Sequence, residues 1–185
     1  MRYVLASKSP RRKELMKLIS SSFIVTSEDI NEESSYKLTP IEAVKDISIR
    51  KGEAVEKSYP DDLIISADTI VVLDNQIIGK PKDEEDAKKI LKLLSNKSHY
   101  VYTGFTVRYK DKKVTSVVET IVNFNELSDE LIDRYVASGS PLDKAGAYGI
   151  QDNDKFPIIK NIIGSLDNVV GFPVKEIKEV IDEVI

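Results

Sequence analysis

The stretch LIISADTIVVL, residues 63–73, is a long and nearly continuous apolar run that decides the fold class. Such a run is typical of a strand that is covered on both faces, as in sheets flanked by helices. Strand and helix patterns alternate along the rest of the chain. Strands are expected at residues 3–5, 23–26, 76–78, 99–109 and 113–124, and helices at residues 10–19, 40–57, 81–94, 128–139 and from 173 onward. This alternation predicts an α/β fold.

Composition limits the classes of protein that remain. At 185 residues with 41% hydrophobic residues, the chain is long enough for one domain, expected to span residues 1–185. The absence of cysteine excludes disulfides, zinc–thiolate sites and thiol catalysis. The net charge of −4 argues against a broad nucleic-acid-binding surface. No apolar run approaches the ~18 residues that cross a bilayer and no secretory signal is evident, so we expect a soluble intracellular protein without a membrane partner.

A basic helix start follows the first strand. Ser9 has the side chain of an N-cap, Pro10 suits the first helical position, and residues 11–13 are Arg-Arg-Lys. A cation in a first helical turn is unfavourable by about 0.3–1 kcal/mol, because the helix dipole and unpaired N–H groups are already positive there. The pattern indicates a phosphate site, since guanidinium groups bind phosphate oxygens bidentately. The alternative is a solvated helix end balanced by Glu14 and other surface acids.

Two charged residues occupy positions that packing alone would leave apolar. Asp68 interrupts the run of residues 63–73, and a buried carboxylate must be paired, metal-bound or protonated. Lys51 lies in the middle of the apolar face of the helix expected at residues 40–57. It therefore needs an anionic partner, either Asp68 or a bound phosphate. The alternative for Lys51 is a lysine that snorkels at the rim of the core.

Three further features carry weaker signals. Lys80 follows Gly79 directly before a helix, which suits phosphate binding, but the acids at residues 83–86 are alternative partners. His99 is the single histidine and lies among strand-like residues, so we expect a structural or surface role. The glycine-rich stretch 139–153 has no clear periodicity, and a loop of that length is usually functional or disordered.

Eight short blocks resemble the Maf family in order and spacing, and together they cover essentially the whole chain. They are SKSPRR (7–12), DINE (29–32), RKG (50–52), SADTIV (66–71), GKP (79–81), YTG (102–104), GAYGIQ (146–151) and NVVGFP (168–173). The resemblance implies a nucleoside triphosphate pyrophosphatase that cuts between the α- and β-phosphates. It also implies an elongated α/β fold similar to that of ITP pyrophosphatases, with a mixed twisted sheet and a cleft between two lobes. A cytoplasmic, metal-dependent enzyme that forms a homodimer is expected.

The resemblance also implies roles for particular residues. It assigns catalysis to Asp68, as the proton acceptor, Lys51 and Lys80, substrate binding to Ser7, Arg11, Arg12, Thr69 and Gln151, and metal binding to Glu32 and Asp68. Carboxylate oxygens suit Mg²⁺ or Mn²⁺ in a chain without cysteine. The amide of Gln151 complements O4 and N3–H of uracil or thymine. Without the resemblance, the favoured interpretation of Gln151 is a surface residue.

The blocks are similar to the branch of the family that acts on dTTP and UTP. The branch that acts on 7-methyl-GTP differs at the positions of Arg11, Thr69 and Gln151. Two departures occur: Asn31 stands where Asp is frequent, which we expect to weaken metal binding slightly, and Gly52 stands where Ala is usual, which mainly lowers helix propensity. Two other functions remain open. One is a pyrophosphatase for 7-methyl-GTP or another modified nucleotide, and the other is a non-catalytic nucleotide-binding regulator of cell division and septum formation. Asp68 opposes the second, because polyphosphate binding gains nothing from a further negative group unless a metal bridges it.

Overall fold

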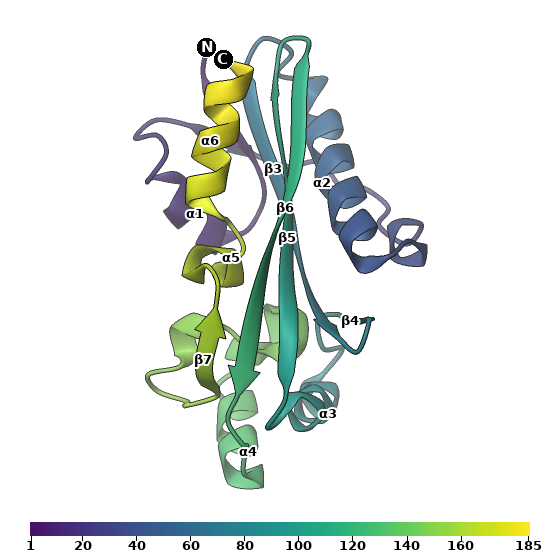
Figure 1. Cartoon of the computed structure of the whole chain (residues 1–185), viewed down its shortest axis with the longest axis vertical. Coiled ribbons are helices and arrows are strands. Elements are labelled where there is room, and N and C mark those ends of the chain that lie inside the picture. The colour runs from purple at the N-terminus through teal and green to yellow at the C-terminus, as the bar shows by residue number, and fades with distance from the viewer. The chain divides into compact units, whose positions relative to one another are not determined.

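The computed structural model describes all of residues 1–185, which form strands, α-helices and short 3-10 helices (Figure 1). The strands are β1 (Tyr3–Ala6), β2 (Ile24–Thr26), β3 (Leu63–Leu73), β4 (Gln76–Ile78), β5 (Ser98–Tyr109), β6 (Lys112–Phe124) and β7 (Ile159–Ile163). The α-helices are α1 (Pro10–Met16), α2 (Pro40–Glu56), α3 (Glu84–Leu94), α4 (Asp129–Ala137), α5 (Leu166–Val170) and α6 (Val174–Val184). The 3-10 helices are η1 (Ser35–Lys37), η2 (Ser140–Asp143), η3 (Ala145–Ala147) and η4 (Ile150–Asp152).

The seven strands form one mixed sheet, in the order β2-β1-β3-β5-β6-β7, with β4 paired to β3. Strand β1 runs parallel to both β2 and β3, and Tyr3 lies opposite Leu63 in the register. The pairs β3–β4 and β6–β7 are antiparallel. The α/β class and the mixed sheet expected from the sequence are therefore confirmed.

Contacts divide the chain into two compact units. The first unit comprises Met1–Thr69, Thr103–Val118 and Gly171–Ile185, and the second unit comprises Ile70–Tyr102 and Glu119–Val170. Strands β3, β5 and β6 contribute residues to both units. Each unit has its own hydrophobic core.

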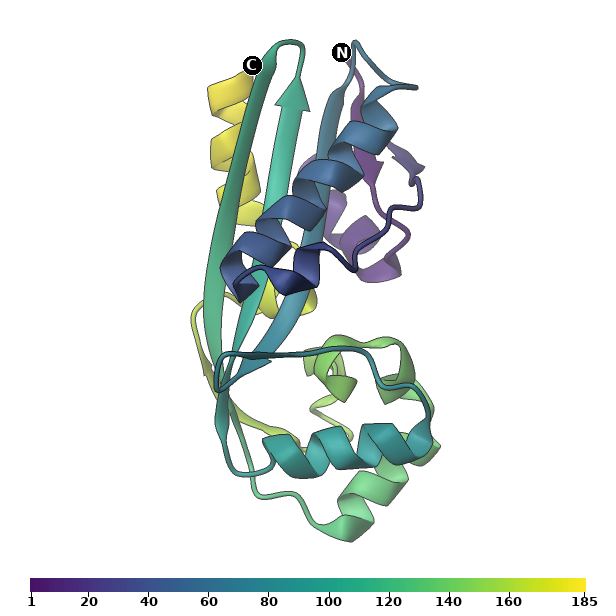
Figure 2. The same ribbon diagram turned by 90° about the vertical axis from the view of Figure 1, so that its right-hand side faces the viewer.

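Helices cover both faces of the sheet in the first unit, with α2 on one side and α1 and α6 on the other (Figures 1 and 2). Successive side chains of a strand point to opposite faces. Leu63 and Ile65 of β3 accordingly pack in the same core as the apolar side of α6, whereas Ile64 packs in a separate cluster with Val55 of α2. Asp68 shares the face of Ile64, so β3 directs this carboxylate toward α2.

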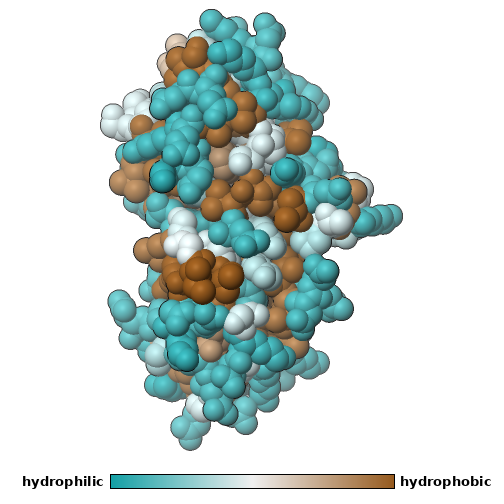
Figure 3. Space-filling model, in the orientation of Figure 1, coloured by the Kyte–Doolittle hydropathy of each residue, from teal (hydrophilic) through white to brown (hydrophobic).

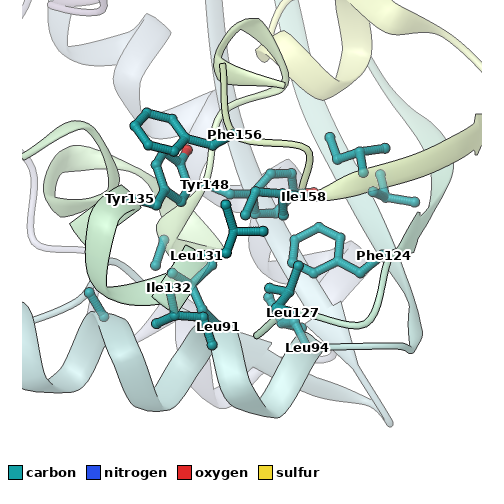
Figure 4. Packing of buried hydrophobic residues seen from close by; sticks show 14 of the residues in the cluster. Leu91, Leu94, Phe124, Leu127, Leu131, Ile132, Tyr135, Tyr148, Phe156 and Ile158 are labelled. Carbon is teal, nitrogen blue, oxygen red and sulfur yellow. The ribbon is translucent and has the colours of Figure 1, made fainter. Parts of the chain in front are cut away.

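The core of the second unit is built between helices α3 and α4, strand β6 and the chain that follows α4. Figure 4 shows this packing. Its buried members include Leu91, Leu94, Phe124, Leu127, Leu131, Ile132, Tyr135, Tyr148, Phe156 and Ile158. Ser128 caps α4 as the sequence indicates, by accepting a bond from a backbone N–H group. Helix α3 was expected from residue 81 but begins at Glu84, because Asp83 is its N-cap. Tyr135 places its ring in the core and its hydroxyl at the edge of that core.

Two features were compared with those of membrane-spanning proteins, the hydropathy of the surface and the length of the helices. Hydrophilic side chains cover much of the face in Figure 3, with apolar patches between them. None of the helices combines the length and the apolar character that a bilayer-spanning segment requires.

Several local expectations need correction. The first helix was expected at residues 10–19 but ends at Met16, and tight turns with N–H bonds from Leu18 and Ile19 follow it. The stretch 139–153 contains three 3-10 helices and is not an irregular loop. Strand β7 and helix α5 were not predicted.

Gly52 does more than lower the helix propensity of α2. A Cβ at this position would lie 2.8 Å from Ser66 Oγ and 3.1 Å from Cδ of Arg108. The hydroxyl of Ser66 is itself fixed, because it donates a 2.7 Å hydrogen bond to the carbonyl of Ser48 in α2. The missing side chain of Gly52 therefore lets α2 approach β3 in the stretch that holds Lys51 opposite Asp68.

Candidate active site

Asp68, Lys51 and Glu32 meet in the first unit. Lys51 of α2 places its Nζ 2.8 Å from Asp68 Oδ1 and 3.1 Å from Glu32 Oε1. Asp68 is only 8% exposed, and its second oxygen, Oδ2, is buried without a hydrogen-bond partner. The expected pairing of Lys51 with Asp68 is confirmed, so Lys51 does not snorkel free at the rim. An unsatisfied buried carboxylate oxygen is costly, which indicates that Oδ2 is kept for a ligand or a proton.

The side chain of Glu32 is held from a second direction by a tyrosine. The hydroxyl of Tyr36, in η1, donates a 2.9 Å hydrogen bond to Glu32 Oε2. Partial burial of the phenol raises the pKa of Tyr36, and the nearby charges of Asp68 and Glu32 raise it further, so the phenol keeps its proton. Glu32 is thus oriented by one hydrogen bond from Tyr36 and one ion pair from Lys51.

Arg50 fastens the loop of Glu32 to α2. Its guanidinium donates from Nε to Asp46 Oδ2 at 3.0 Å, from Nη1 to the carbonyl of Asn31 at 2.6 Å, and from Nη2 to Ser35 Oγ. The hydroxyl of Ser35 in turn donates to Asp46 Oδ2 at 2.7 Å. Asn31, which stands where an Asp is frequent, uses Oδ1 to accept from the N–H of Glu33 within its own loop.

The basic helix start begins as predicted, but Arg12 is tied into the fold. Ser9 caps α1 by accepting from the N–H of Arg12. The guanidinium of Arg12 donates to two backbone carbonyls, at 2.8 Å to Gly171 and at 2.9 Å to Ala67. It also donates to Thr69 Oγ1 at 3.1 Å. Burial lowers the pKa of Arg12, although the charge of Asp68 opposes this effect. Arg12 therefore joins α1, β3 and the segment before α6.

The other candidate residues of this region lie close to Arg12 in the chain or in space. Ser7 is buried, and its Oγ accepts from the N–H of Ser9 at 3.1 Å. Thr69 Oγ1 lies 2.9 Å from Thr103 Oγ1. Arg11 is half-buried in the first turn of α1. The structure therefore brings Ser7, Arg12 and Thr69 together.

Lys80 and Gln151 belong to the second unit, and both are exposed. The acids near Lys80 serve the start of α3. Asp83 Oδ1 accepts from the N–H of Asp86 at 2.8 Å, and Asp86 Oδ2 accepts from the N–H of Lys82 at 2.9 Å. Gln151 is the central residue of η4.

His99 has the structural role expected of it. It is buried, its Nε2 lies 2.6 Å from the hydroxyl of Tyr148, and its ring packs edge-on against Phe124. Burial lowers the pKa of His99 to about 4. The histidine is therefore neutral near pH 7 and belongs to the core of the second unit.

The donor set for a metal consists of carboxylates. No group of three or more His, Cys, Asp and Glu side chains is placed to hold a metal ion. Asp68 and Glu32 instead form a pair, since both contact the Nζ of Lys51. Mg²⁺ is commonly held by one or two carboxylates plus substrate phosphates and water. The pair of carboxylates from Asp68 and Glu32 fits that kind of ion.

Sequence reasoning did not find Tyr36 or Arg50. Tyr36 lies in the short 3-10 helix η1, in a stretch of sequence with no periodicity, and a single tyrosine carries no local signal of a partner four residues away. Arg50 is the neighbour of Lys51 on α2, and only Lys51 stood out from the sequence, because it lies on the apolar face of the helix. A helical wheel places Arg50 beside Asp46, one turn earlier, which is the one signal that pointed to this ion pair.

Comparison with known proteins identifies relatives over nearly the whole chain. A family model described as a Maf-like protein matches residues 2–184. A dTTP/UTP pyrophosphatase from Bacillus cereus (strain B4264) is 43% identical over 180 residues, which cover 95% of this chain and 94% of that protein. A dTTP/UTP pyrophosphatase from Dictyoglomus turgidum (strain DSM 6724 / Z-1310) is 43% identical over 182 residues, covering 97% and 94%.

Among solved structures, the chain is similar to a HAM1 protein from Coxiella burnetii. The TM-score is 0.59 at 16% sequence identity, and the match covers 99% of each chain. At that identity the similarity concerns the fold alone.

Proposed function

The chain belongs to the Maf family, and from this premise we propose that it is a nucleoside triphosphate pyrophosphatase that hydrolyses dTTP and UTP to the monophosphate and pyrophosphate. The observation that carries the proposal is the buried carboxylate of Asp68, paired through Oδ1 with Lys51 and open at Oδ2. A protein that only bound polyphosphate would gain nothing from this negative group unless a metal bridged it to the phosphates, whereas a hydrolase also needs a base.

The reaction needs a water molecule, a base and a stabilised leaving group. Water attacks the α-phosphorus, the bond between that phosphorus and the bridging oxygen breaks, and pyrophosphate leaves with the bridging oxygen and the electron pair of that bond. Asp68 accepts the proton of the attacking water at Oδ2, the oxygen that Lys51 does not occupy. Lys51 fixes the orientation of the carboxylate, and this preorganisation is lost if either partner is removed.

A divalent cation fits the proposal. Glu32 and Asp68 would hold Mg²⁺ or Mn²⁺, which supplies positive charge to the phosphate oxygens when bound. Tyr36 and Arg50 support the metal ligand Glu32, Tyr36 through its side chain and Arg50 through its loop. Hydrogen bonds to a metal-binding side chain, or to the loop that carries it, fix its orientation toward the metal.

The remaining predicted residues would bind the nucleotide. Arg11, Lys80 and the N–H groups at the start of α1 would neutralise the triphosphate. Ser7 and Thr69 would offer hydroxyl groups, and Arg12 holds Thr69 in place through its hydrogen bond. In the second unit, Gln151 would read O4 and N3–H of the pyrimidine through its amide.

A nucleotide panel with product identification tests this function. Purified protein is incubated with dTTP, UTP, CTP and 7-methyl-GTP in the presence of Mg²⁺ or Mn²⁺, and products are separated by ion-exchange chromatography. We expect monophosphate and pyrophosphate from dTTP and UTP. Release of orthophosphate and a diphosphate as the main products would refute the proposed reaction, preference for 7-methyl-GTP would refute the proposed substrates, and binding without turnover would refute catalysis.

The oligomeric state and the location are also proposals, and they rest on the family resemblance. We propose a homodimer located in the cytoplasm. Analytical ultracentrifugation of the purified chain measures the mass in solution, and a monomeric mass at micromolar concentration would contradict the homodimer.

A further inference from the structure

The turn that carries Gln151 has a defined geometry within the second unit. In η4, the N–H of Asp152 donates to the carbonyl of Gly149 at 3.0 Å, so Gln151 lies inside a closed turn. The amide of Gln151 folds back over this turn, because a Cβ at Gly149 would lie only 2.6 Å from Gln151 Nε2. The orientation of the amide therefore depends on where the backbone of this turn is held.

A single buried hydroxyl holds both ends of that turn. Tyr135 of α4 is buried in the core of the second unit. Its hydroxyl accepts a 2.9 Å hydrogen bond from the N–H of Gly149 and donates a 2.7 Å hydrogen bond to Asp152 Oδ2. Burial is the main cause that raises the pKa of Tyr135, so the hydroxyl keeps the proton it donates. The two contacts flank Gln151 on either side.

Polar groups of η2 and of Lys144, the residue that follows it, complete the support. The hydroxyl of Ser140 also donates to Asp152 Oδ2, at 2.6 Å. The Nζ of Lys144, a buried lysine, donates to the carbonyl of Ser140 at 2.5 Å and to Ser140 Oγ at 3.0 Å. Asp152 is thereby fixed by two donors, and the position of Ser140 is fixed by a buried cation. None of these four side chains is needed for the chemistry proposed at Asp68.

We propose that Tyr135 is a positioning residue for base selection, acting with Asp152 to present the amide of Gln151 in one orientation. The ligand concerned is a pyrimidine base with a ring N–H next to a carbonyl oxygen. The inference rests on the proposed role of Gln151 and adds the residues that make this role specific. A rigid core element, α4, thus sets the geometry of an exposed recognition side chain.

The test is a double-mutant cycle between Tyr135→Phe and Gln151→Ala. Tyr135→Phe keeps the buried ring and removes the hydroxyl. We expect kcat/KM for dTTP and UTP to fall about tenfold, mainly through KM, because a looser turn weakens binding but leaves the reacting groups in place. CTP, which lacks the N3–H and O4 pattern, should lose less than about twofold. In the Gln151→Ala background, Tyr135→Phe should cause no further fall in kcat/KM for dTTP, since the amide that Tyr135 positions is already absent.

The control and the outcomes separate this inference from the proposed function. Tyr148→Phe removes another buried hydroxyl of the second unit, one whose partner is His99 and not the turn, and it should leave the ratio of dTTP to CTP unchanged. Equal losses on dTTP and CTP, or the same loss in the Gln151→Ala background, would show that Tyr135 only stabilises the unit and would overturn the inference. If Gln151→Ala itself keeps the preference for dTTP, the proposed base reading fails. If Gln151→Ala loses the preference and Tyr135→Phe keeps it, the inference alone fails.

A second variant covers the case in which Tyr135→Phe does not fold. Asp152 is half-buried. The Asp152→Asn substitution keeps the size of this side chain and weakens the hydrogen bonds that it accepts from Tyr135 and Ser140. It should lower the ratio of dTTP to CTP in the same direction, with a folded thermal transition. A folded Asp152→Asn variant with the ratio of the unmodified chain would overturn the proposal.

Discussion

Replacing Asp68 by Asn removes one negative charge from the first unit and keeps the size and shape of the side chain. In the structure, Asp68 contributes an Oδ1 that binds Lys51 at 2.8 Å and a buried Oδ2 without a partner. An amide in this place still offers one oxygen to Lys51. It offers no basic oxygen to a water molecule and a weaker ligand to a metal.

The expected effects on catalysis and stability differ in size. The loss of a general base lowers kcat by about 10²–10⁴-fold, so we expect a fall of at least about 10²-fold. Removing one partner of a buried ion pair costs about 3–5 kcal/mol when the other charge is left alone. In the variant, the charge of Lys51 is still paired with Glu32, whose Oε1 lies 3.1 Å from Lys51 Nζ. We therefore expect the free energy of unfolding to change by no more than about 1 kcal/mol.

The assay compares turnover with folding in two variants. Release of pyrophosphate from dTTP gives kcat, and urea denaturation followed by circular dichroism gives the free energy of unfolding. Asp62→Asn is the matched control, because Asp62 is also a buried carboxylate of the first unit and accepts hydrogen bonds from Arg2. It should lower stability by about 1–2 kcal/mol and leave kcat per folded molecule unchanged. A folded Asp68→Asn protein with near-normal kcat would refute the reasoning and make Asp68 a structural residue.

Four further predictions follow from other parts of the structure. As the pH falls from 6.5 to about 4, the unmodified chain should lose about 3 kcal/mol of unfolding free energy relative to His99→Gln, because His99 is protonated at a higher pH in the unfolded chain than in the folded one. Urea titrations of both proteins measure this difference, and a difference that does not change with pH would contradict the prediction. Glu32→Gln should raise the Mn²⁺ concentration for half-maximal activity at least about tenfold, and Mn²⁺ binding followed by electron paramagnetic resonance checks the ligand directly. Gly52→Ala should not raise the free energy of unfolding by the roughly 1 kcal/mol that its higher helix propensity offers, because the new Cβ meets Ser66 Oγ. Adding Ser66→Ala removes this contact, so the double variant should be more stable than Gly52→Ala alone. Gln151→Glu should lower kcat/KM for dTTP and UTP about 10- to 100-fold and affect CTP less, and equal losses on all substrates would argue against base reading.

Most of the sheet and the longer helices were predictable from local patterns. The apolar run of residues 63–73 coincides with β3, and the predicted caps Ser9 and Ser128 mark real helix starts. The pairing of Lys51 with Asp68 was also predictable, because a charge on an apolar face must find a partner within the fold. These features depend on residues a few positions apart or on one strong physical constraint.

The features that were missed depend on distant or irregular backbone. The carbonyls that bind Arg12 come from residues 55 and 159 positions along the chain, and every residue has a carbonyl, so no sequence pattern marks these two. The turns of residues 139–153 include Gly146 at φ +71° and Ala147 at φ 59°, which interrupt any periodic pattern. Strand β7 was not predicted from the sequence because two of its residues, Lys160 and Asn161, are exposed and polar.

The hydrogen bond from Arg12 to Gly171 has a consequence for synthesis on the ribosome. Residues 1–69 contain all the charged groups that meet at Asp68, yet the first unit also needs residues 171–185. Those last residues bring the carbonyl that Arg12 binds and the apolar side of α6, including Ile177 and Ile181, which share a core with Leu5. Because a nascent chain emerges from its N-terminus, this half of the core stays uncovered until residues 171–185 have left the ribosome. The emergence of residues 171–185, and not the synthesis of the charged groups that meet at Asp68, is therefore the step at which the first unit is able to close.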